Sequence, residues 1–148
     1  MNAEERARPV VFFDTNVLLY LIGDDARKTA AAANALSTDK HECVVSAQIL
    51  SEFVNVLRKK ARAPWNEIRE HLTRIHLLCR VEPGTDATVQ DALSISERGG
   101  FAWYDAVVIA AALSAGATRL LTEDMQDGRK MGRLTIVNPF GGKTMGTR

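Results

Sequence analysis

The chain has 148 residues, of which 46% are hydrophobic and 25% charged, and its formal net charge is +1. This composition is typical of a folded globular protein with one core, and it excludes a disordered chain. Its apolar runs fall far short of the roughly 20 residues of a membrane span and no signal peptide is visible, so we expect a cytoplasmic protein without membrane contact. We also expect a single domain over 1–148, with a core at about 9–140 and loose ends at 1–8 and 141–148.

The small net charge is unevenly distributed along the chain. Residues 50–80 carry seven Lys/Arg against three Asp/Glu, residues 125–148 carry five against one, and the remainder carries seven against fourteen, which gives +4, +4 and −7. Basic segments around an acidic centre suit a polyanion handled through metal ions, although solvated helix faces give the same numbers. The two cysteines, Cys43 and Cys79, lack the spacing of zinc ligands and predict free buried thiols.

Short apolar runs alternate along the chain with stretches of helical periodicity. The apolar runs predict five strands, at residues 10–13, 42–45, 76–81, 118–122 and 134–138. Helices are predicted from the first strand to about residue 22 and at about 25–37, 47–61, 64–75, 86–98 and 103–115. This alternation predicts a parallel sheet covered on both faces, in which ligands bind at the carboxyl ends of strands where the winding reverses.

An aspartate interrupts the first apolar stretch, VVFFDTNVLLYLIG, where the predicted strand meets the helix. A lone ionised carboxylate in apolar surroundings is costly, so it normally has a partner, a shifted pKa or a bound metal. This residue, Asp14, is followed directly by Thr15 and Asn16. The sequence therefore predicts that some distant group compensates Asp14.

Two further acids lie on predicted helices. Glu52 stands just beyond the edge of the apolar stripe of helix 47–61, where it can reach over the rim of the sheet or simply pair with a lysine at the boundary. Asp105 is the only acid in WYDAVVIAAALSAG, whose apolar character all round predicts a central buried helix. Its place in the first turn is also that of a capping residue, and the two roles are compatible.

The fourth acidic position follows the predicted strand 118–122, in LLTEDMQDG. Asp124 is the candidate there, with Glu123 as a rival and Asp127 as an outlying helper, while a polar turn is the alternative. Four acids on one rim of a sheet need compensation to stay ionised at close range. Because oxygen ligands select hard cations, Mg²⁺ or Mn²⁺ fits this set better than zinc.

Four segments together resemble, in order and spacing, the motifs of the PIN-domain nucleases, and most of all the small VapC-like toxins of toxin–antitoxin modules. These segments are FFDTNVLLYL, SAQILSEFVNVL, WYDAVVIAAALSAGA and LLTEDMQDG…LTIVNPF, and the resemblance covers about residues 9–140. It implies a three-layer α/β/α sandwich on a five-stranded parallel sheet. By position it also implies that one or two Mg²⁺ or Mn²⁺ ions are held by an acidic quartet, which comprises Asp14, Glu52, Asp105 and Asp124.

The same resemblance implies supporting roles for the polar neighbours of these acids. Asn16 corresponds to the residue that stabilises the site by hydrogen bonding, and Thr15 and Thr122 look like hydroxyls placed behind the ligands. Many members of the family have Thr-x-Asn or Thr-x-Asp at the fourth motif. Here Glu123 adds a further acid, so the choice between Asp124 and Glu123 stays open.

The activity that the resemblance implies is metal-dependent hydrolysis of RNA phosphodiester bonds. Phosphate contacts from basic side chains would position the strand, and the candidates are Arg58, Lys59, Lys60, Arg62, Arg129, Lys130 and Arg133. Trp103 and Tyr104 are placed to stack a base, although helix packing is the expected use of at least one of them. The resemblance further implies a homodimer and a cognate antitoxin, seated on an apolar groove between the second and third helices.

Other functions with an aspartate after the first strand fit less well. A haloacid dehalogenase-type phosphatase needs a second aspartate where Asn16 stands, and a response-regulator receiver needs a phospho-acceptor after the third strand, which here ends RVEPG. No phosphate-binding P-loop motif occurs. Two alternatives remain open, namely a metal-free PIN-like module that binds RNA or protein without cutting, and a housekeeping RNA-processing nuclease.

Overall fold

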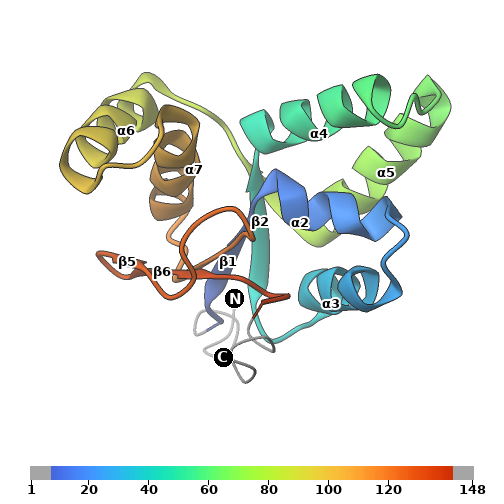
Figure 1. Ribbon diagram of the computed structural model, residues 1–148, viewed down its shortest axis with the longest axis horizontal. Helices are drawn as coiled ribbons and strands as arrows, with labels where there is room; N and C mark the ends of the chain where they lie inside the picture. Colours follow the sequence, from blue (N-terminus) through green and yellow to red (C-terminus); the bar gives the residue numbers. More distant parts are fainter. Residues whose placement is uncertain (1–7, 142–148) are drawn as a thin grey trace.

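The computed structural model describes residues 8–141, which form one six-stranded sheet in the order β3-β2-β1-β4-β6-β5 (Figure 1). Five of the strands are parallel, namely β1 (Val10–Phe13), β2 (Glu42–Ser46), β3 (Cys79–Glu82), β4 (Arg119–Leu121) and β6 (Leu134–Val137). The two-residue β5 (Lys130–Met131) pairs antiparallel with β6 and was not predicted from the sequence. The predicted parallel sheet is otherwise confirmed.

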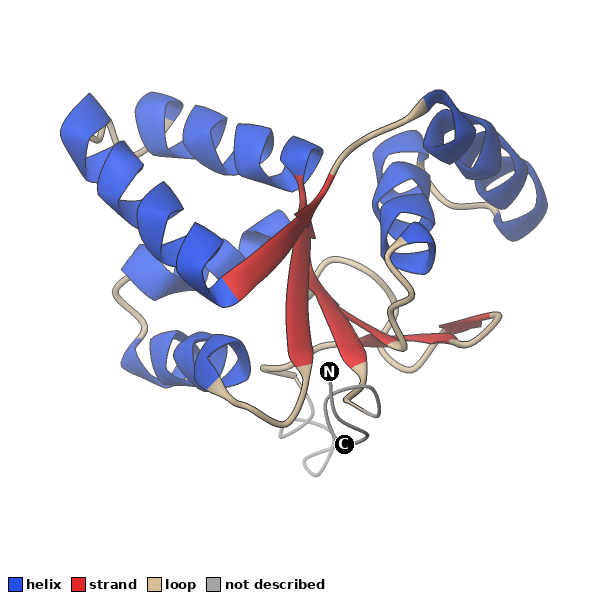
Figure 2. Cartoon of the chain, turned by 180° about the vertical axis from the view of Figure 1, so that it is seen from behind, coloured by secondary structure: helices blue, strands red, loops and turns tan. Residues whose placement is uncertain are grey.

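Helices cover both faces of this sheet, as Figures 1 and 2 show. One side carries α2 (Thr15–Leu19), the 3-10 turn η1 (Tyr20–Ile22), α3 (Ala26–Ser37), α4 (Ala47–Lys59) and α5 (Trp65–Leu78). The other side carries α6 (Asp86–Gly99) and α7 (Trp103–Ser114). The three-layer α/β/α architecture expected from the resemblance is therefore confirmed.

Strand β1 lies in the middle of the sheet and sets the position of the site. From β1 the chain winds outward through β2 to β3, and it then crosses back to place β4 on the other side of β1. The register pairs Phe13 of β1 with Leu121 of β4, so the residues that follow these two strands emerge side by side. The winding thus reverses between β1 and β4, where ligands of open α/β sheets bind.

Local sequence explains where the helices next to this edge begin and end. Ser46 ends β2 and caps α4, since its Oγ accepts the backbone N–H of Ile49 at 3.1 Å. Gly100 ends α6 at a φ of +71°, a left-handed conformation that costs glycine little. Helix α7 is buried over most of its length, as its apolar sequence predicts.

The prediction of a strand over 76–81 is wrong for its first three residues. Helix α5 continues to Leu78, and the N–H of Cys79 still bonds to the carbonyl of Ile75. Only Ile75 on that last turn faces the core, whereas Leu77 is 80% exposed and therefore has no buried strand position to fill. The apolar run HLL thus belongs to a helix end, and the strand begins at Cys79.

The core lies between the sheet and its two helical layers and includes both cysteines, which are free and buried as predicted. Cys43 and Cys79 face each other in register on β2 and β3. Within residues 8–141 no helix is long and apolar enough to cross a bilayer. The loose ends that we expect at 1–8 and 141–148 lie almost entirely outside the described residues.

Candidate metal centre

Asp14 leaves β1 at the switch point and lies almost completely inside the protein, with 8% of its surface exposed. It caps the short helix α2, because its Oδ1 accepts the backbone N–H of Thr15 at 2.8 Å. Its Oδ2 accepts the hydroxyl of Thr122, which follows β4, also at 2.8 Å. The buried carboxylate of Asp14 is therefore stabilised in part by Thr122, which follows the neighbouring strand.

These hydrogen bonds only partly offset the cost of burying the carboxylate. Burial raises the pKa of Asp14 from 3.8 to about 6, and the nearby negative charges of Glu52 and Asp124 push it in the same direction. The hydrogen bonds from Thr122 and Thr15 act against this rise. A positive charge beside Asp14 would therefore stabilise its ionised form.

Asn16 connects the ends of β1 and β4 through a single side chain. Its Nδ2 lies 3.3 Å from Oδ2 of Asp14, 3.1 Å from Oγ1 of Thr122 and 2.9 Å from Oδ2 of Asp124. Its Oδ1 accepts the backbone N–H of Glu123 at 3.2 Å. The single amide of Asn16 thus contacts two acids, Asp14 and Asp124, and the backbone of the loop after β4.

Glu52 reaches the site from the first half of α4 and has two neutral partners. The hydroxyl of Thr15 donates to its Oε2 at 3.0 Å, and Nε2 of Gln48 donates to its Oε1 at 3.0 Å. The alternative of a boundary pair with lysine is therefore wrong. Gln48 was not predicted, although its place four residues before Glu52 puts the two side chains on one helix face.

Asp105 projects from the first turn of α7 without capping it. The helix begins after Ala102 with no side-chain cap, and Asp105 makes no hydrogen bond or ion pair with any other residue in 8–141. Burial raises the pKa of Asp105, and the charge of Asp124 adds to the rise. The capping alternative is wrong, and the carboxylate stays available for a ligand.

The two neighbouring acids after β4 point in different directions. Asp124 turns toward Asn16, and its own backbone N–H bonds to Oγ1 of Thr122 at 3.2 Å. Glu123 turns away and binds Lys28 and the hydroxyl of Tyr20. Asp127 lies outside the cluster as well, because its Oδ1 accepts the backbone N–H of Asn138 at 2.8 Å. The geometry therefore favours Asp124 over Glu123 as the fourth acid.

The donor set at this edge fits a hard divalent cation by chemistry and by charge. All four acids offer oxygen, and Asp14 and Asp105 both have pKa values raised by burial and by neighbouring carboxylates. Residues 8–141 nevertheless contain no group of three or more Asp, Glu, His or Cys side chains already assembled to hold an ion. Asp14 is in electrostatic range of Glu52 and Asp124, and Asp105 is in range of Asp124, so ion binding would require these side chains to draw together.

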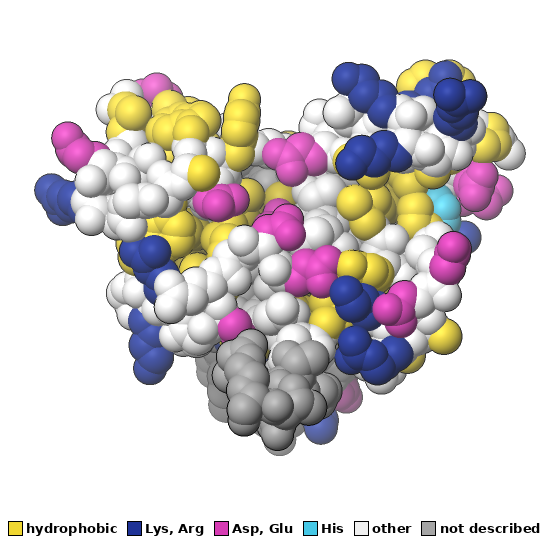
Figure 3. Space-filling model, in the orientation of Figure 1, with side chains coloured by type: hydrophobic (Ala, Val, Ile, Leu, Met, Phe, Trp, Pro, Cys, Tyr) yellow, Lys and Arg dark blue, Asp and Glu magenta, His cyan; other side chains and the backbone are white. Residues whose placement is uncertain are grey.

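The face of the molecule seen in Figure 3 is hollowed by an open notch. Figure 3 shows acidic side chains at the centre of this face, below the notch that separates the α6–α7 side from the α4–α5 side. Lysine and arginine side chains gather over the upper part of α4 and α5 in the same view. An extended polyanion could thus meet positive charge on the wall of the notch and acids at its floor.

The basic residues predicted to contact RNA divide into two groups. Arg58 packs over the ring of Trp65 and donates to the carbonyl of Ala63, and Arg129 packs over Phe101 and donates to the carbonyl of Gly99. The others are exposed without a side-chain partner among the described residues, and they are Lys59, Lys60, Arg62, Lys130 and Arg133. The second group is the one free to bind phosphate.

Trp103 and Tyr104 are both accessible at the start of α7. Trp103 is 37% exposed and Tyr104 is 68% exposed. Helix packing therefore uses most of the Trp103 surface but little of Tyr104. Tyr104, directly before Asp105, remains available to stack a base.

Comparison with known proteins agrees with this geometry. The family model described as "PIN domain" matches residues 11–129. Ribonuclease VapC7 of Mycobacterium tuberculosis is 29% identical over 122 residues, which are 78% of this chain and 82% of that protein. The family-model match spans the four acids, since residues 11–129 include all of their positions.

Several solved structures with a similar fold are described as toxins or toxin–antitoxin complexes. A toxin–antitoxin complex from Klebsiella pneumoniae has a TM-score of 0.63 at 22% identity and covers 88% of this chain and 98% of that chain. VapC20 of Mycobacterium tuberculosis, described as a sarcin-ricin loop cleaving toxin, has a TM-score of 0.59 at 18% identity, with coverage of 74% and 86%. VapBC2 of Rickettsia felis, bound to a promoter DNA fragment, has a TM-score of 0.60 at 15% identity, with coverage of 86% and 96%. The fold, the acidic edge and the family match agree, and the chain belongs to the PIN-domain family.

Proposed function

We propose that this chain is a metal-dependent endoribonuclease that hydrolyses RNA phosphodiester bonds in the cytoplasm as the toxin of a type II toxin–antitoxin module. The observation that carries the proposal is the set of acids at the switch point, where the buried carboxylate of Asp14, with its raised pKa, lies near those of Glu52 and Asp124. Perturbed carboxylates in a cleft are typical of functional sites. The family match and the ribonuclease relative support the same activity.

One or two Mg²⁺ or Mn²⁺ ions would be held by Asp14, Asp105 and Asp124, with Glu52 as a further ligand or as the group that orients the attacking water. A bound divalent cation supplies Lewis-acid stabilisation of the charge that develops on phosphate oxygens. Asn16, Thr15 and Thr122 orient the carboxylates through the hydrogen bonds described above. Exposed lysines on α4 would bind the RNA backbone away from the acids.

The test is cleavage of a labelled mixed RNA pool by the purified chain in Mn²⁺. We expect cutting that disappears in EDTA and in the variant Asp14→Asn/Asp105→Asn. The matched control is Asp39→Asn/Asp91→Asn, which changes two exposed carboxylates outside the cluster and should cut like the wild type. A wild type that folds, fails to cut and fails to bind Mn²⁺ would favour a non-catalytic binding module.

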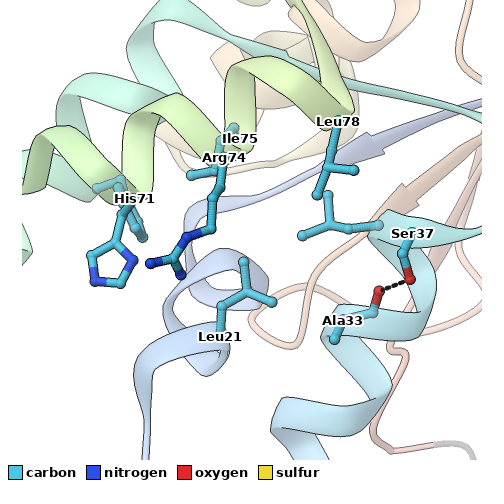
Figure 4. Close-up of a pocket in the computed structure, with 9 residues that line it drawn as sticks. Leu21, Ala33, Ser37, His71, Arg74, Ile75 and Leu78 are labelled. Atoms are coloured by element: carbon cyan, nitrogen blue, oxygen red, sulfur yellow. Dashed lines mark hydrogen bonds between the residues drawn. The ribbon is translucent and has the colours of Figure 1, made fainter.

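The surface of this chain between α3 and α5 is suited to bind the expected antitoxin. An apolar pocket of about 210 Å³ lies there, lined by residues that include Leu21, Phe53, Ile75 and Leu78 (Figure 4). Its lining includes Leu36 of α3 and Phe53 of α4, which are the second and third predicted helices, between which the family resemblance places the antitoxin. We expect Leu78→Asp to abolish neutralisation by the cognate antitoxin while RNA cleavage by the free chain continues.

A homodimer is the assembly that the family resemblance implies. Val89 and Leu93 are exposed apolar side chains four residues apart on one face of α6, and association of two copies would cover them. Sedimentation velocity of the wild type and of Leu93→Lys tests this arrangement. We expect a dimer that the substitution converts to a monomer.

A further inference from the structure

The pair of acids after β4 raises the question of what decides which one faces the site. Glu123 and Asp124 are adjacent in the chain, yet of their two carboxylates only that of Asp124 contacts Asn16, while Glu123 meets Asn16 through its backbone N–H. The carboxylate of Glu123 is instead bound by Nζ of Lys28 at 3.1 Å and by the hydroxyl of Tyr20. These two partners come from η1 and α3, about a hundred residues earlier in the chain.

Lys28 is itself held in place from several directions. The cap of α3 fixes its backbone, because Oδ1 of Asp25 accepts the N–H of Lys28 at 3.1 Å. Its Nζ donates to the hydroxyl of Tyr20 at 3.0 Å and lies over the rings of Tyr20 and Phe140, at 4.5 and 5.4 Å. Lys28 and Glu123 are each only 23% exposed at the side chain, so solvent screens their attraction less than that of a surface pair.

The aromatic residues connect this contact to the end of the sheet. The rings of Tyr20 and Phe140 meet edge to face at 4.8 Å, and Phe140 is buried just after β6. The carbonyl of Phe140 accepts a hydrogen bond from Arg27 at 3.3 Å. The loop that carries Asp124 is therefore bound to Asn16 on one side and, through Glu123, to Lys28 on the other.

We propose that Lys28 and Tyr20 are positioning residues, which anchor Glu123 and thereby present Asp124 to the metal site. This proposal rests on the proposed function, because it requires that the acids bind a divalent ion. Asp124 makes no hydrogen bond or ion pair with either residue in the described part of the chain, so their effect would pass through the backbone of the loop. The contacts of Lys28 and Tyr20 with Glu123 thus favour Asp124 as the ligand, and the sequence of the loop alone does not reveal these contacts.

A purely electrostatic role and a positioning role of Lys28 predict opposite changes in the affinity for a divalent ion. Removing a cation near the site strengthens binding of a divalent ion if the only effect is electrostatic. Releasing the loop weakens binding, because Asp124 loses its fixed place among the ligands. The variant Tyr20→Phe separates the effects further, since it removes a hydroxyl without changing any charge and keeps the ring against Phe140.

The experiment is calorimetric titration of Mn²⁺ into the full chain and its variants, with thermal unfolding in EDTA recorded alongside. We expect Lys28→Met to weaken Mn²⁺ binding about tenfold, at the low end for loss of an outer partner of a metal site. Tyr20→Phe should weaken it in the same direction by a smaller factor, and Lys28→Arg should restore binding. Lys40→Met, which removes an exposed lysine in the loop before β2, is the matched control and should bind like the wild type.

The double variant Lys28→Met/Glu123→Gln completes the cycle. If Lys28 and Glu123 act as one anchor, the double variant binds Mn²⁺ no more weakly than the weaker binder of the single variants Lys28→Met and Glu123→Gln. Tighter binding by Lys28→Met, wild-type binding by the double variant, or an unchanged Kd with a lowered Tm would overturn the proposal. A wild type that binds no Mn²⁺ would instead overturn the proposed function, so the two failures are distinguishable.

Discussion

The hydroxyl of Thr122 donates a hydrogen bond of 2.8 Å to Oδ2 of Asp14 and so joins the carboxyl ends of β4 and β1. The two residues are 108 positions apart in the chain and meet because their strands are neighbours in register. Thr122 is completely buried and also bonds to Asn16 and to the backbone of Asp124. This one side chain therefore stabilises the buried acid and orders the loop that carries its neighbour.

We expect Thr122→Val to lower the free energy of unfolding by about 1–3 kcal/mol, since it removes the hydroxyl that donates to Oδ2 of the buried Asp14 carboxylate while the volume stays nearly constant. Urea unfolding at pH 7.5 in EDTA measures this change. Thr135→Val on β6 is the matched control, because the Thr135 side chain makes no hydrogen bond in the described part of the chain. Equal losses in the two variants would contradict the role of the Thr122–Asp14 contact.

The raised pKa of Asp14 makes the metal-free protein sensitive to pH. An acid whose pKa is higher in the folded state costs nothing below its unfolded pKa of 3.8 and its full penalty above the folded value of about 6. Over this window the wild type should lose up to about 3 kcal/mol relative to Asp14→Asn. Urea unfolding of both proteins at pH 4 and pH 7 in EDTA measures the difference.

The outcome that would contradict this prediction is a stability difference between wild type and Asp14→Asn that does not grow from pH 4 to pH 7. Asp39→Asn, in the exposed loop before β2 at the amino ends of the strands, controls for the general effect of removing a carboxylate.

Metal binding should stabilise the fold by mass action. At a Mn²⁺ concentration of 100 times Kd the gain is about 2.7 kcal/mol, which corresponds to a rise in Tm of about 5–10 °C for a chain of this size. We expect the rise in the wild type and its absence in Asp14→Asn/Asp105→Asn. Differential scanning calorimetry with and without EDTA measures it, and an equal rise in both proteins would place the ion elsewhere.

The exposed lysines at the end of α4 should contribute to RNA affinity through phosphate contacts. Each contact to single-stranded RNA changes the slope of log Kd against log salt by about 0.7, so Lys59→Ala/Lys60→Ala should reduce the slope by about 1.4. Fluorescence anisotropy in an Asp14→Asn background measures binding without cleavage. Lys40→Ala is the control, and an unchanged slope in the double variant would exclude both lysines from the RNA path.

Much of the fold was predictable because apolar runs of strand length alternate with helical periodicity. The failures were local. HLL at the end of α5 has the composition of a strand, yet helix hydrogen bonding continues to Leu78. The two-residue β5 is too short to produce a periodic signal, and it forms only because β6 offers a free edge.

The sequence by itself determined the element order and placed Asp14, Asp105 and Asp124 near the ends of strands or helices, because such ends follow from local hydrophobic patterning. It placed Glu52 at the margin of the apolar stripe of α4 by the same patterning. It also predicted that Asp14 needs compensation, since burial of a carboxylate is costly wherever it occurs. Only the tertiary structure decided that Thr122 and Asn16 provide part of it, and that Glu123 turns to Lys28 while Asp124 turns to Asn16. Those choices depend on partners that are distant in the chain, and strand order alone brings them within hydrogen-bonding distance.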